Sequence, residues 1–226
     1  MVVSNENIDS LIESYLFFRD NGVNFSLNLY IEQKNNQKSI LRLDENHSIY
    51  KLCELFDYWA TDKFGKIHIS YFKNILDFIL FNKKYICTFT SCLGRWIGVH
   101  FDGSLAPCNR YFPEEYRFGN VYDYSDIDKV FESTGFTNLL QKAIQRREKC
   151  KSCEIYDFCC GGCNNVALNE NGIENNGGIS CKILIEIYRH IDCFITRVYK
   201  NKFNEEYYNP ILVEMINKAS QLNCRL

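Results

Sequence analysis

Cysteine is the residue that most constrains what this chain can fold into. Twelve of its 226 residues are cysteine, and eight of the twelve lie between positions 87 and 163. The first residues, Met1 to Ile8, have neither the basic cap nor the apolar stretch of a secretory signal, so we expect a cytoplasmic protein. Because disulfides do not persist in a reducing cytoplasm, the cysteines indicate metal ligation.

Composition limits the class of protein further. Hydrophobic residues make up 46% of the chain and aromatic residues 15%, which is enough for a sizeable core and excludes a globally disordered protein. Lys and Arg number 26 against 28 Asp and Glu, so the net charge is −2 and lacks the basic excess of a nucleic-acid binder. No apolar run approaches the roughly 18 residues that span a bilayer. We therefore expect neither a nucleic-acid partner nor a membrane partner.

The densest group of cysteines lies in residues 150–163 and has the spacing of a metal-binding motif. We call this segment the knot. Two residues separate Cys150 from Cys153, and three separate Cys159 from Cys163. A short turn that carries two close thiolates aims both at one metal centre, and later cysteines complete the coordination from other segments. The two glycines before Cys163 suit a backbone that approaches a metal centre closely and takes positive φ.

Two further cysteines bracket a predicted β-hairpin. Cys92 precedes the hairpin, and Cys108 ends its return strand. Residues 96–101 alternate in polarity, and Asp102-Gly103 is typical of a type I′ turn, in which both central residues take positive φ. We expect the folded hairpin to bring the two cysteines together.

The rest of the chain is predicted to be mostly helical. Apolar residues recur at spacings of three and four, as on one face of a helix, over residues 8–18, 49–60, 71–81, 130–147, 182–199 and 211–222. Alternating polarity predicts a strand over 24–31, and composition predicts loops over 32–39 and 169–178. Helix, strand and helix in this order indicate part of an α/β layer, too short for a complete barrel of about 250 residues.

Taken together, the cysteines and one glycine form the pattern CX10GX4C, then CX2CX5CX3C, then a last cysteine at 181. This pattern resembles the SPASM domain, the C-terminal auxiliary-cluster domain of radical SAM enzymes that modify peptides and proteins. The resemblance covers roughly residues 85–195. The segment GVHFDGSLAPCNRY is similar to the hairpin of the sulfatase-maturase group, and Gly119-Asn120-Val121 resembles a short motif that often follows it.

The resemblance implies two [4Fe-4S] clusters with interleaved ligands. The first cluster would be held by Cys87, Cys92, Cys108 and Cys163. The second would be held by Cys150, Cys153, Cys159 and Cys181. Four residues separate the first two ligands where the sulfatase-maturase type has five, so an open iron in the first cluster is the alternative to ligation by Cys87. Each cluster takes one ligand from the segment that mostly serves the other, so we expect cluster binding to stabilise the fold.

The resemblance also implies an α+β fold. Residues 1–82 would be an incomplete α/β barrel remnant, the end of a radical SAM barrel with its bridge. Residues 83–200 would be the SPASM domain, a small β-hairpin and helices organised around the two Cys-ligated clusters, and 201–226 a C-terminal helical tail. The stretch FDYWATDKFGKIHISYF (56–72) is similar to part of the radical SAM bridge.

Two features depart from the family. No three cysteines have the CX3CX2C spacing that holds the SAM-cleaving cluster, because Cys159 and Cys163 would need a cysteine where Val166 stands. We therefore expect the rear part of a longer enzyme, inactive alone, whose missing front holds SAM and a third [4Fe-4S] cluster; a stand-alone remnant is the alternative. Asn109 replaces an aspartate of the sulfatase-maturase group, and an amide does not accept a proton at neutral pH. Formylglycine formation by that route is not expected, and a thioether or carbon–carbon crosslink stays open.

The resemblance implies that the clusters accept an electron from a substrate radical and pass it on. The expected partners are a precursor peptide or protein and an electron carrier of the flavodoxin or ferredoxin type. Basic residues near the cysteines either offset the cluster charge or form a solvated face: Arg95, Arg110, Arg146, Arg147, Lys149 and Lys151.

Other interpretations of the cysteines remain. Two four-cysteine sites would also suit a zinc-binding interaction module, and the same domain could serve as a non-catalytic peptide-binding adaptor. Cys160 is the alternative to Cys159 as a ligand. The remaining cysteines, Cys53, Cys193 and Cys224, are predicted to be ordinary thiols, and His68 and His100 to be structural.

Overall fold

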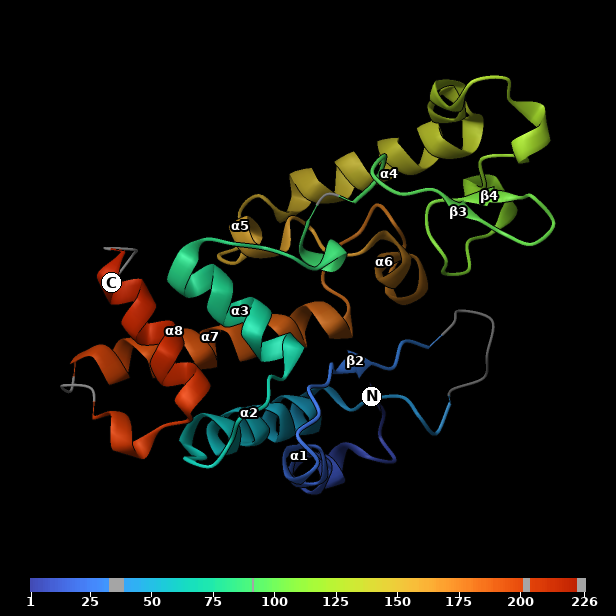
Figure 1. Ribbon diagram of the computed structural model, residues 1–226. Coiled ribbons are helices and arrows are strands. Elements are labelled where there is room, and N and C mark those ends of the chain that lie inside the picture. The colour runs from blue at the N-terminus through green and yellow to red at the C-terminus, as the bar shows by residue number, and fades with distance from the viewer. Residues whose placement is uncertain (33–38, 91, 201–203, 223–226) are drawn as a thin grey trace. The chain divides into compact units, whose positions relative to one another are not determined.

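The computed structural model describes residues 1–32, 39–90, 92–200 and 204–222. Within these ranges most of the regular structure is helical and the strands are short (Figure 1). The chain divides into two compact units, of which the first combines Met1–Tyr85 with Ile179–Leu226 and the second is Ile86–Gly178. The domain boundaries expected after residues 82 and 200 stay a prediction.

Helices dominate the first unit. Its described helices are η1 (Ile8–Ser10), α1 (Leu11–Asp20), α2 (Glu45–Thr61), α3 (Ser70–Phe81), α7 (Ile179–Lys200), η6 (Glu205–Tyr207) and α8 (Pro210–Gln221). Strands β1 (Val2–Val3) and β2 (Asn28–Leu29) pair in parallel, and Phe25 forms a parallel bridge with Ile69. Parallel strands need a crossover connection, and α1 supplies the one between β1 and β2.

Helices α2 and α7 pack against each other because each has one apolar face. The buried stripe of α7 repeats every four residues, as predicted, and consists of Ile183, Ile187, Ile191 and Ile195. On α2, Phe56 is fully buried and meets Phe194 of α7 edge to face at a ring-centroid distance of 5.3 Å. Since burying one such side chain contributes about 1.5–3 kcal/mol, apolar packing is the main stabilising force in this unit.

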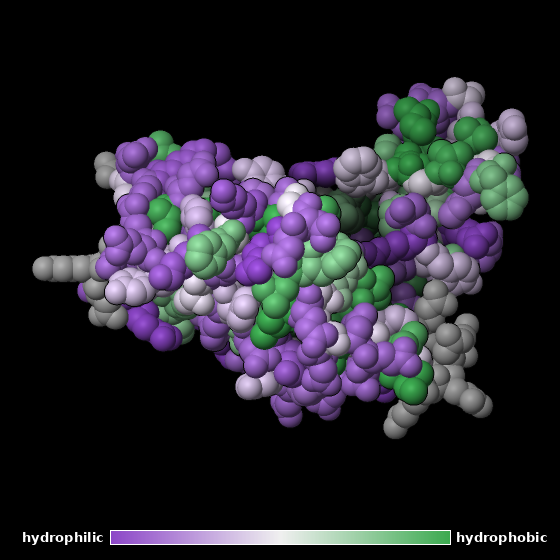
Figure 2. Space-filling view, turned by 60° about the horizontal axis from the view of Figure 1, so that its bottom comes forward, coloured by the Kyte–Doolittle hydropathy of each residue, from purple (hydrophilic) through white to green (hydrophobic). Residues whose placement is uncertain are grey.

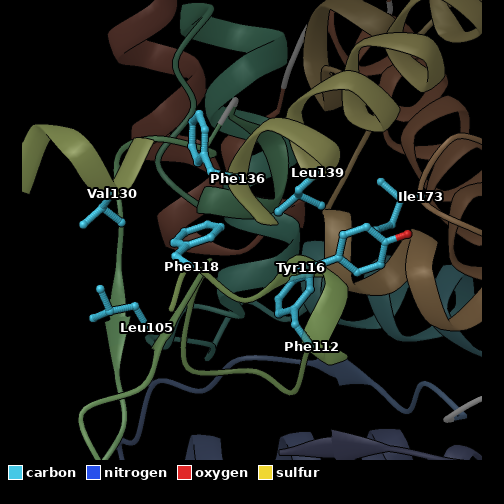
Figure 3. Close-up of a cluster of buried hydrophobic side chains, with 8 residues drawn as sticks. All are labelled: Leu105, Phe112, Tyr116, Phe118, Val130, Phe136, Leu139 and Ile173. Atoms are coloured by element: carbon cyan, nitrogen blue, oxygen red, sulfur yellow. The ribbon is translucent and has the colours of Figure 1, made fainter. Parts of the chain in front are cut away.

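The second unit contains a short hairpin followed by helices. Its described elements are η2 (Cys87–Phe89), β3 (Gly98–Val99), β4 (Leu105–Ala106), η3 (Glu114–Tyr116), η4 (Val121–Asp123), η5 (Ile127–Glu132), α4 (Thr134–Cys150), α5 (Tyr156–Cys159) and α6 (Asn164–Glu170). Side chains from β4, η3, η5 and α4 gather in one buried hydrophobic cluster (Figure 3). Its members are Leu105, Phe112, Tyr116, Phe118, Val130, Phe136, Leu139 and Ile173. This cluster anchors the hairpin to the first half of α4.

The hairpin forms where predicted, but the predicted type I′ turn is wrong. Asp102 is not among the non-glycine residues with positive φ. The Gly103 N–H donates to the His100 carbonyl at 2.9 Å, so Phe101 and Asp102 are the central residues and Gly103, with φ +81°, follows them. The result is a three-residue loop with a glycine bulge. Asp102 stabilises it by accepting hydrogen bonds from the backbone N–H and hydroxyl of Ser104.

The helices lie close to the predicted ranges, and three other segments differ. Only Asn28–Leu29 of the predicted strand 24–31 forms a strand, because its partner β1 is two residues long. Helix α4 starts later than predicted, where Ser133 accepts a hydrogen bond from the Phe136 N–H. The predicted loop 169–178 begins inside α6, and residues 33–38 of the predicted loop 32–39 lie outside the described residues.

The surface is largely hydrophilic on the face shown in Figure 2, where hydrophobic side chains form separate patches. Several exposed hydrophobic side chains belong to the hairpin and to η4, among them Val99, Phe101 and Tyr122. Across the described ranges, the structure contains no helix with both the length and the apolar character needed to cross a bilayer.

Candidate metal centre

The four cysteines assigned to the first cluster lie in the second unit, on four different segments. Cys87 begins η2, Cys92 precedes the hairpin, Cys108 follows β4, and Cys163 is the N-cap residue of α6. The ring of Phe89 in η2 packs against that of Phe158 in α5 at a centroid distance of 4.3 Å and an interplanar angle of 35°, so the first of these segments contacts the segment that carries Cys159.

The pKa shifts of two of these thiols indicate that all four lie near one another. Burial raises the pKa of Cys92, and the nearby thiols of Cys163, Cys87 and Cys108 raise it further. Burial also raises the pKa of Cys108; Cys163 and Cys87 add to the rise, and Arg110 opposes it. A second negative charge nearby disfavours ionisation, whereas a metal centre deprotonates its thiols outright. The structure thus brings together Cys87, Cys92, Cys108 and Cys163.

Three of the cysteines assigned to the second cluster also lie in the second unit. Cys150 ends α4, Cys159 ends α5, and the Cys153 N–H donates to the Cys150 carbonyl at 2.9 Å. Burial raises the pKa of Cys150 and Cys153 adds to the rise, while Arg146 and a hydrogen bond to Asn176 lower it. The fourth, Cys181, lies in α7 of the first unit and stays a predicted ligand.

Between Cys159 and Cys163, three successive residues have a left-handed backbone conformation. Cys160, Gly161 and Gly162 have φ of +51°, +81° and +72°, which confirms the positive φ predicted for the glycines. A Cβ on Gly161 would lie 3.1 Å from Cγ of Arg147, a tight contact that adds to the cost of the positive φ for any larger residue. This tight path turns the chain from α5 to Cys163 within four residues.

A buried arginine holds this path in place. Arg146 is 1% exposed, and its Nε donates to the Gly161 carbonyl at 2.8 Å. Its Nη2 donates to Oδ1 of Asn164 at 2.5 Å, and its Nη1 donates to the carbonyl of Ile173. Sequence reasoning placed Arg146 among six basic residues but did not predict that it is buried. The available signal was its position four residues before Cys150, on the same face of one helix.

Two other basic residues near the cysteines, Lys149 and Lys151, face solvent. Lys151 is 59% exposed and pairs with Glu148 at 2.7 Å, and Lys149 is exposed and donates to Asn175 at 2.9 Å. Of the two interpretations of the basic residues, an offset to cluster charge suits Arg146, which is buried beside the cysteines. A solvated face suits the two lysines, which face solvent.

The described cysteines are free thiols, as ligands of an iron–sulfur cluster must be. No disulfide joins any two of the eleven cysteines that the structure describes, so the thiols are available as ligands. In the part of the chain that the structure describes, no three His, Cys, Asp or Glu side chains surround one point closely enough for a single metal ion. A tetrahedral zinc site with bonds of about 2.3 Å needs sulfurs about 3.8 Å apart, whereas each thiolate of a four-iron cluster binds a different iron. Neighbouring thiols on four segments fit the cluster.

The cysteines predicted to be ordinary thiols have varied surroundings. Cys53 in α2 is half-buried; burial, Asp57 and Glu186 raise its pKa to about 11. Cys193 is exposed on α7. Cys224 lies outside the described residues. Their lack of a metal role stays a prediction, as does the choice of Cys159 over Cys160.

Comparison with known proteins confirms the resemblance predicted from the cysteine spacing. Residues 87–154 match the SPASM family, described as an iron-sulfur cluster-binding domain. The matched segment includes the hairpin, α4 and the first pair of the knot, so it coincides with most of the second unit.

Curated relatives belong to one group of enzymes. A cysteine-type anaerobic sulfatase-maturating enzyme of Clostridium perfringens strain ATCC 13124 is 31% identical over 114 residues, which are 50% of this chain and 30% of that protein. The enzyme of the same description from strain 13 is 26% identical over 72% of this chain and 45% of its own length. A serine-type enzyme of Bacteroides thetaiotaomicron is 23% identical over 69% and 38%.

Solved structures show the same fold. Native anSMEcpe with bound AdoMet and Cp18Cys peptide has a TM-score of 0.71 and 23% identity, and the match covers 88% of this chain and 56% of that one. Histidine-tagged anSMEcpe with bound AdoMet also has a TM-score of 0.71, at 21% identity, over 96% and 56%. This chain thus spans about half the length of the solved proteins, and the matches cover less than half of the curated relatives.

Proposed function

We propose that this chain is the auxiliary-cluster portion of a radical SAM enzyme that modifies a peptide or protein. The observation that carries the proposal is the grouping of the Cys87, Cys92, Cys108 and Cys163 thiols inside the unit that matches an iron-sulfur cluster-binding domain. All-cysteine donor sets on separate segments are the usual ligands of four-iron clusters.

Two [4Fe-4S] clusters are proposed, with the ligand sets that the resemblance to the SPASM domain implies. Cys87, Cys92, Cys108 and Cys163 would hold the first cluster. Cys150, Cys153, Cys159 and Cys181 would hold the second, the last of them on the resemblance alone. When bound, the clusters supply one-electron acceptor capacity for a substrate radical. The chain's own residues would fix where each thiolate lies.

The first unit is proposed to be the end of a radical SAM barrel and its bridge. The parallel pair β1–β2, joined through α1, and the parallel bridge between Phe25 and Ile69 are the pairings such a remnant would retain. The 96% coverage of this chain by a solved protein nearly twice as long supports the same assignment. A longer parent would hold SAM and a third [4Fe-4S] cluster in the part that precedes this chain.

The proposed substrate is a precursor peptide or protein, with a flavodoxin or ferredoxin type of electron carrier as the second partner. A peptide bound to anSMEcpe supports the substrate class. Exposed hydrophobic side chains at the hairpin, such as Phe101, offer apolar contacts to a peptide. Asn109 is exposed beside Cys108 and carries an amide, so a modification other than formylglycine formation is proposed.

Metal analysis of the chain prepared without oxygen tests the proposal. We expect a brown protein that absorbs near about 400 nm and contains about eight iron atoms and as many acid-labile sulfides, as two four-iron clusters require. A colourless protein with two zinc ions per chain would instead establish the zinc-binding module.

A further inference from the structure

Arg146 is a buried cation whose hydrogen bonds all go to neutral acceptors. Its guanidinium donates to the carbonyls of Gly161, Gly162 and Ile173 and to the side-chain oxygen of Asn164. None of the ion pairs found among the described residues involves it. A buried charge without a counter-charge costs several kcal/mol, so the position of Arg146 calls for an anion nearby.

The proposed ligands are the groups that surround this cation. Gly162 and Asn164, which both receive its hydrogen bonds, flank Cys163 in the sequence. Cys150 is one helical turn further along α4 and is also buried. Cys159 lies on the same knot, and its carbonyl accepts the Gly162 N–H at 2.8 Å. Arg146 therefore lies among ligands of both proposed clusters.

The proposed clusters would supply the anion that Arg146 lacks. Burial lowers the pKa of Arg146 and Arg147 acts in the same direction, whereas Cys150, Cys163 and Cys159 raise it. A [4Fe-4S] core of +2 with four thiolates has a charge of about −2, which supplies the missing anion.

We propose that Arg146 is a positioning residue that orients the knot and provides a shared positive counter-charge for both clusters. The proposal rests on the proposed function, because it needs the clusters to be present. Reduction by a chemical reductant adds one electron to a cluster and changes its charge from about −2 to about −3, with no bond made or broken. A fixed cation stabilises the more negative state, so Arg146 raises the reduction potential of both clusters.

A redox titration of the anaerobically prepared chain, followed by absorbance and electron paramagnetic resonance, tests this role. Arg146→Met removes the charge and keeps the bulk, and Arg146→Lys keeps the charge. Lys151→Met is the matched control, since it removes an exposed cation next to the same ligands. We expect Arg146→Met to disfavour reduction of both clusters by at least about tenfold, which is about 59 mV for a one-electron couple. Arg146→Lys and the control should stay close to wild type.

The outcomes separate the two proposals. Wild-type chain without clusters contradicts the proposed function itself. Loaded Arg146→Met with wild-type potentials, or Arg146→Lys shifted as far as Arg146→Met, overturns the role of the charge. If Arg146→Met does not load, Arg146→Lys decides: loading with wild-type potentials supports the counter-charge, and failure to load shows that only the hydrogen-bonding geometry of arginine matters.

Discussion

The first unit and the knot of the second unit, residues 150–163, are stabilised in different ways. Helices α2 and α7 of the first unit join through fully buried apolar side chains such as Phe56 and Ile187. The knot has three left-handed residues in a row, a buried arginine and several thiols, with Ile155 and Phe158 as its buried apolar side chains beyond the cysteines. From this difference we predict that the first unit is stable without metal, whereas the knot depends on the proposed clusters.

Removing one proposed ligand is expected to have the largest effect on the knot. Cys163→Ala takes one thiolate from the first cluster, so iron per chain should fall by about half. Cys193→Ala removes an exposed thiol from α7 and serves as the matched control, with iron content unchanged. Iron and sulfide analysis of the two variants checks the prediction, and equal iron in both would remove Cys163 from the ligand set.

A cavity in the first unit should lower the stability of that unit and leave the iron of the first cluster in place. Ile187 is 0% exposed in α7, and Ile187→Ala should destabilise the first unit by about 2–5 kcal/mol. The iron of the first cluster should stay, because its four proposed ligands all lie in the second unit. The control is Ile144→Ala, a 47% exposed isoleucine of α4, for which we expect a change below about 0.5 kcal/mol. Denaturant unfolding measures both, and loss of more than half of the iron in Ile187→Ala would contradict the independence of the two regions.

The two glycines of the knot provide a smaller, internal test. Gly161→Ala meets Cγ of Arg147 at 3.1 Å in addition to the penalty for positive φ, which is about 1–2 kcal/mol. Gly162→Ala has the φ penalty alone, since nothing lies within 4 Å of its added methyl group. Unfolding of the loaded chain should therefore show a larger loss for Gly161→Ala. Equal losses would indicate that Arg147 moves aside without cost.

The smallest expected effect is a pH dependence in the first unit. The pKa of Cys53 is raised to about 11, so its neutral thiol stabilises the fold at low pH. This stabilisation is complete below the ordinary thiol pKa near 9 and is lost as pH rises toward about 11. With solvent screening we expect a loss of about 1–2 kcal/mol over this interval, absent in Cys53→Ala. A pH series of unfolding midpoints of the metal-free chain checks it, and identical pH profiles would contradict it.

Local spacing predicted much of the fold and of the candidate site. The isoleucine stripe of α7, the hairpin and the cysteine groups follow from residues near one another in the sequence. Helices α5 and α6 span only four and seven residues, which is too short for an apolar period to be recognised. Asp102-Gly103 suits a type I′ turn and a glycine bulge equally well, so its sequence does not decide between them.

The role of Arg146 required tertiary structure. Its sequence neighbours Arg147, Lys149 and Lys151 have similar charges, and the local signal that distinguishes it, its place four residues before Cys150, does not by itself predict burial. Burial follows from the return of residues 161–173 onto α4, where three carbonyls and Asn164 meet the guanidinium. Contacts between segments separated by 15 to 27 residues decide this arrangement, and sequence periodicity does not report them.

Hydrogen exchange of the chain with clusters bound and after anaerobic removal of iron tests the central claim most directly. We predict that amides of the knot, such as those of Cys160 and Gly162, lose their protection when iron is removed, while amides of α2 and α7 keep theirs. Unchanged protection of the knot after complete iron removal would contradict the claim that the cysteines of the second unit hold metal clusters that order it.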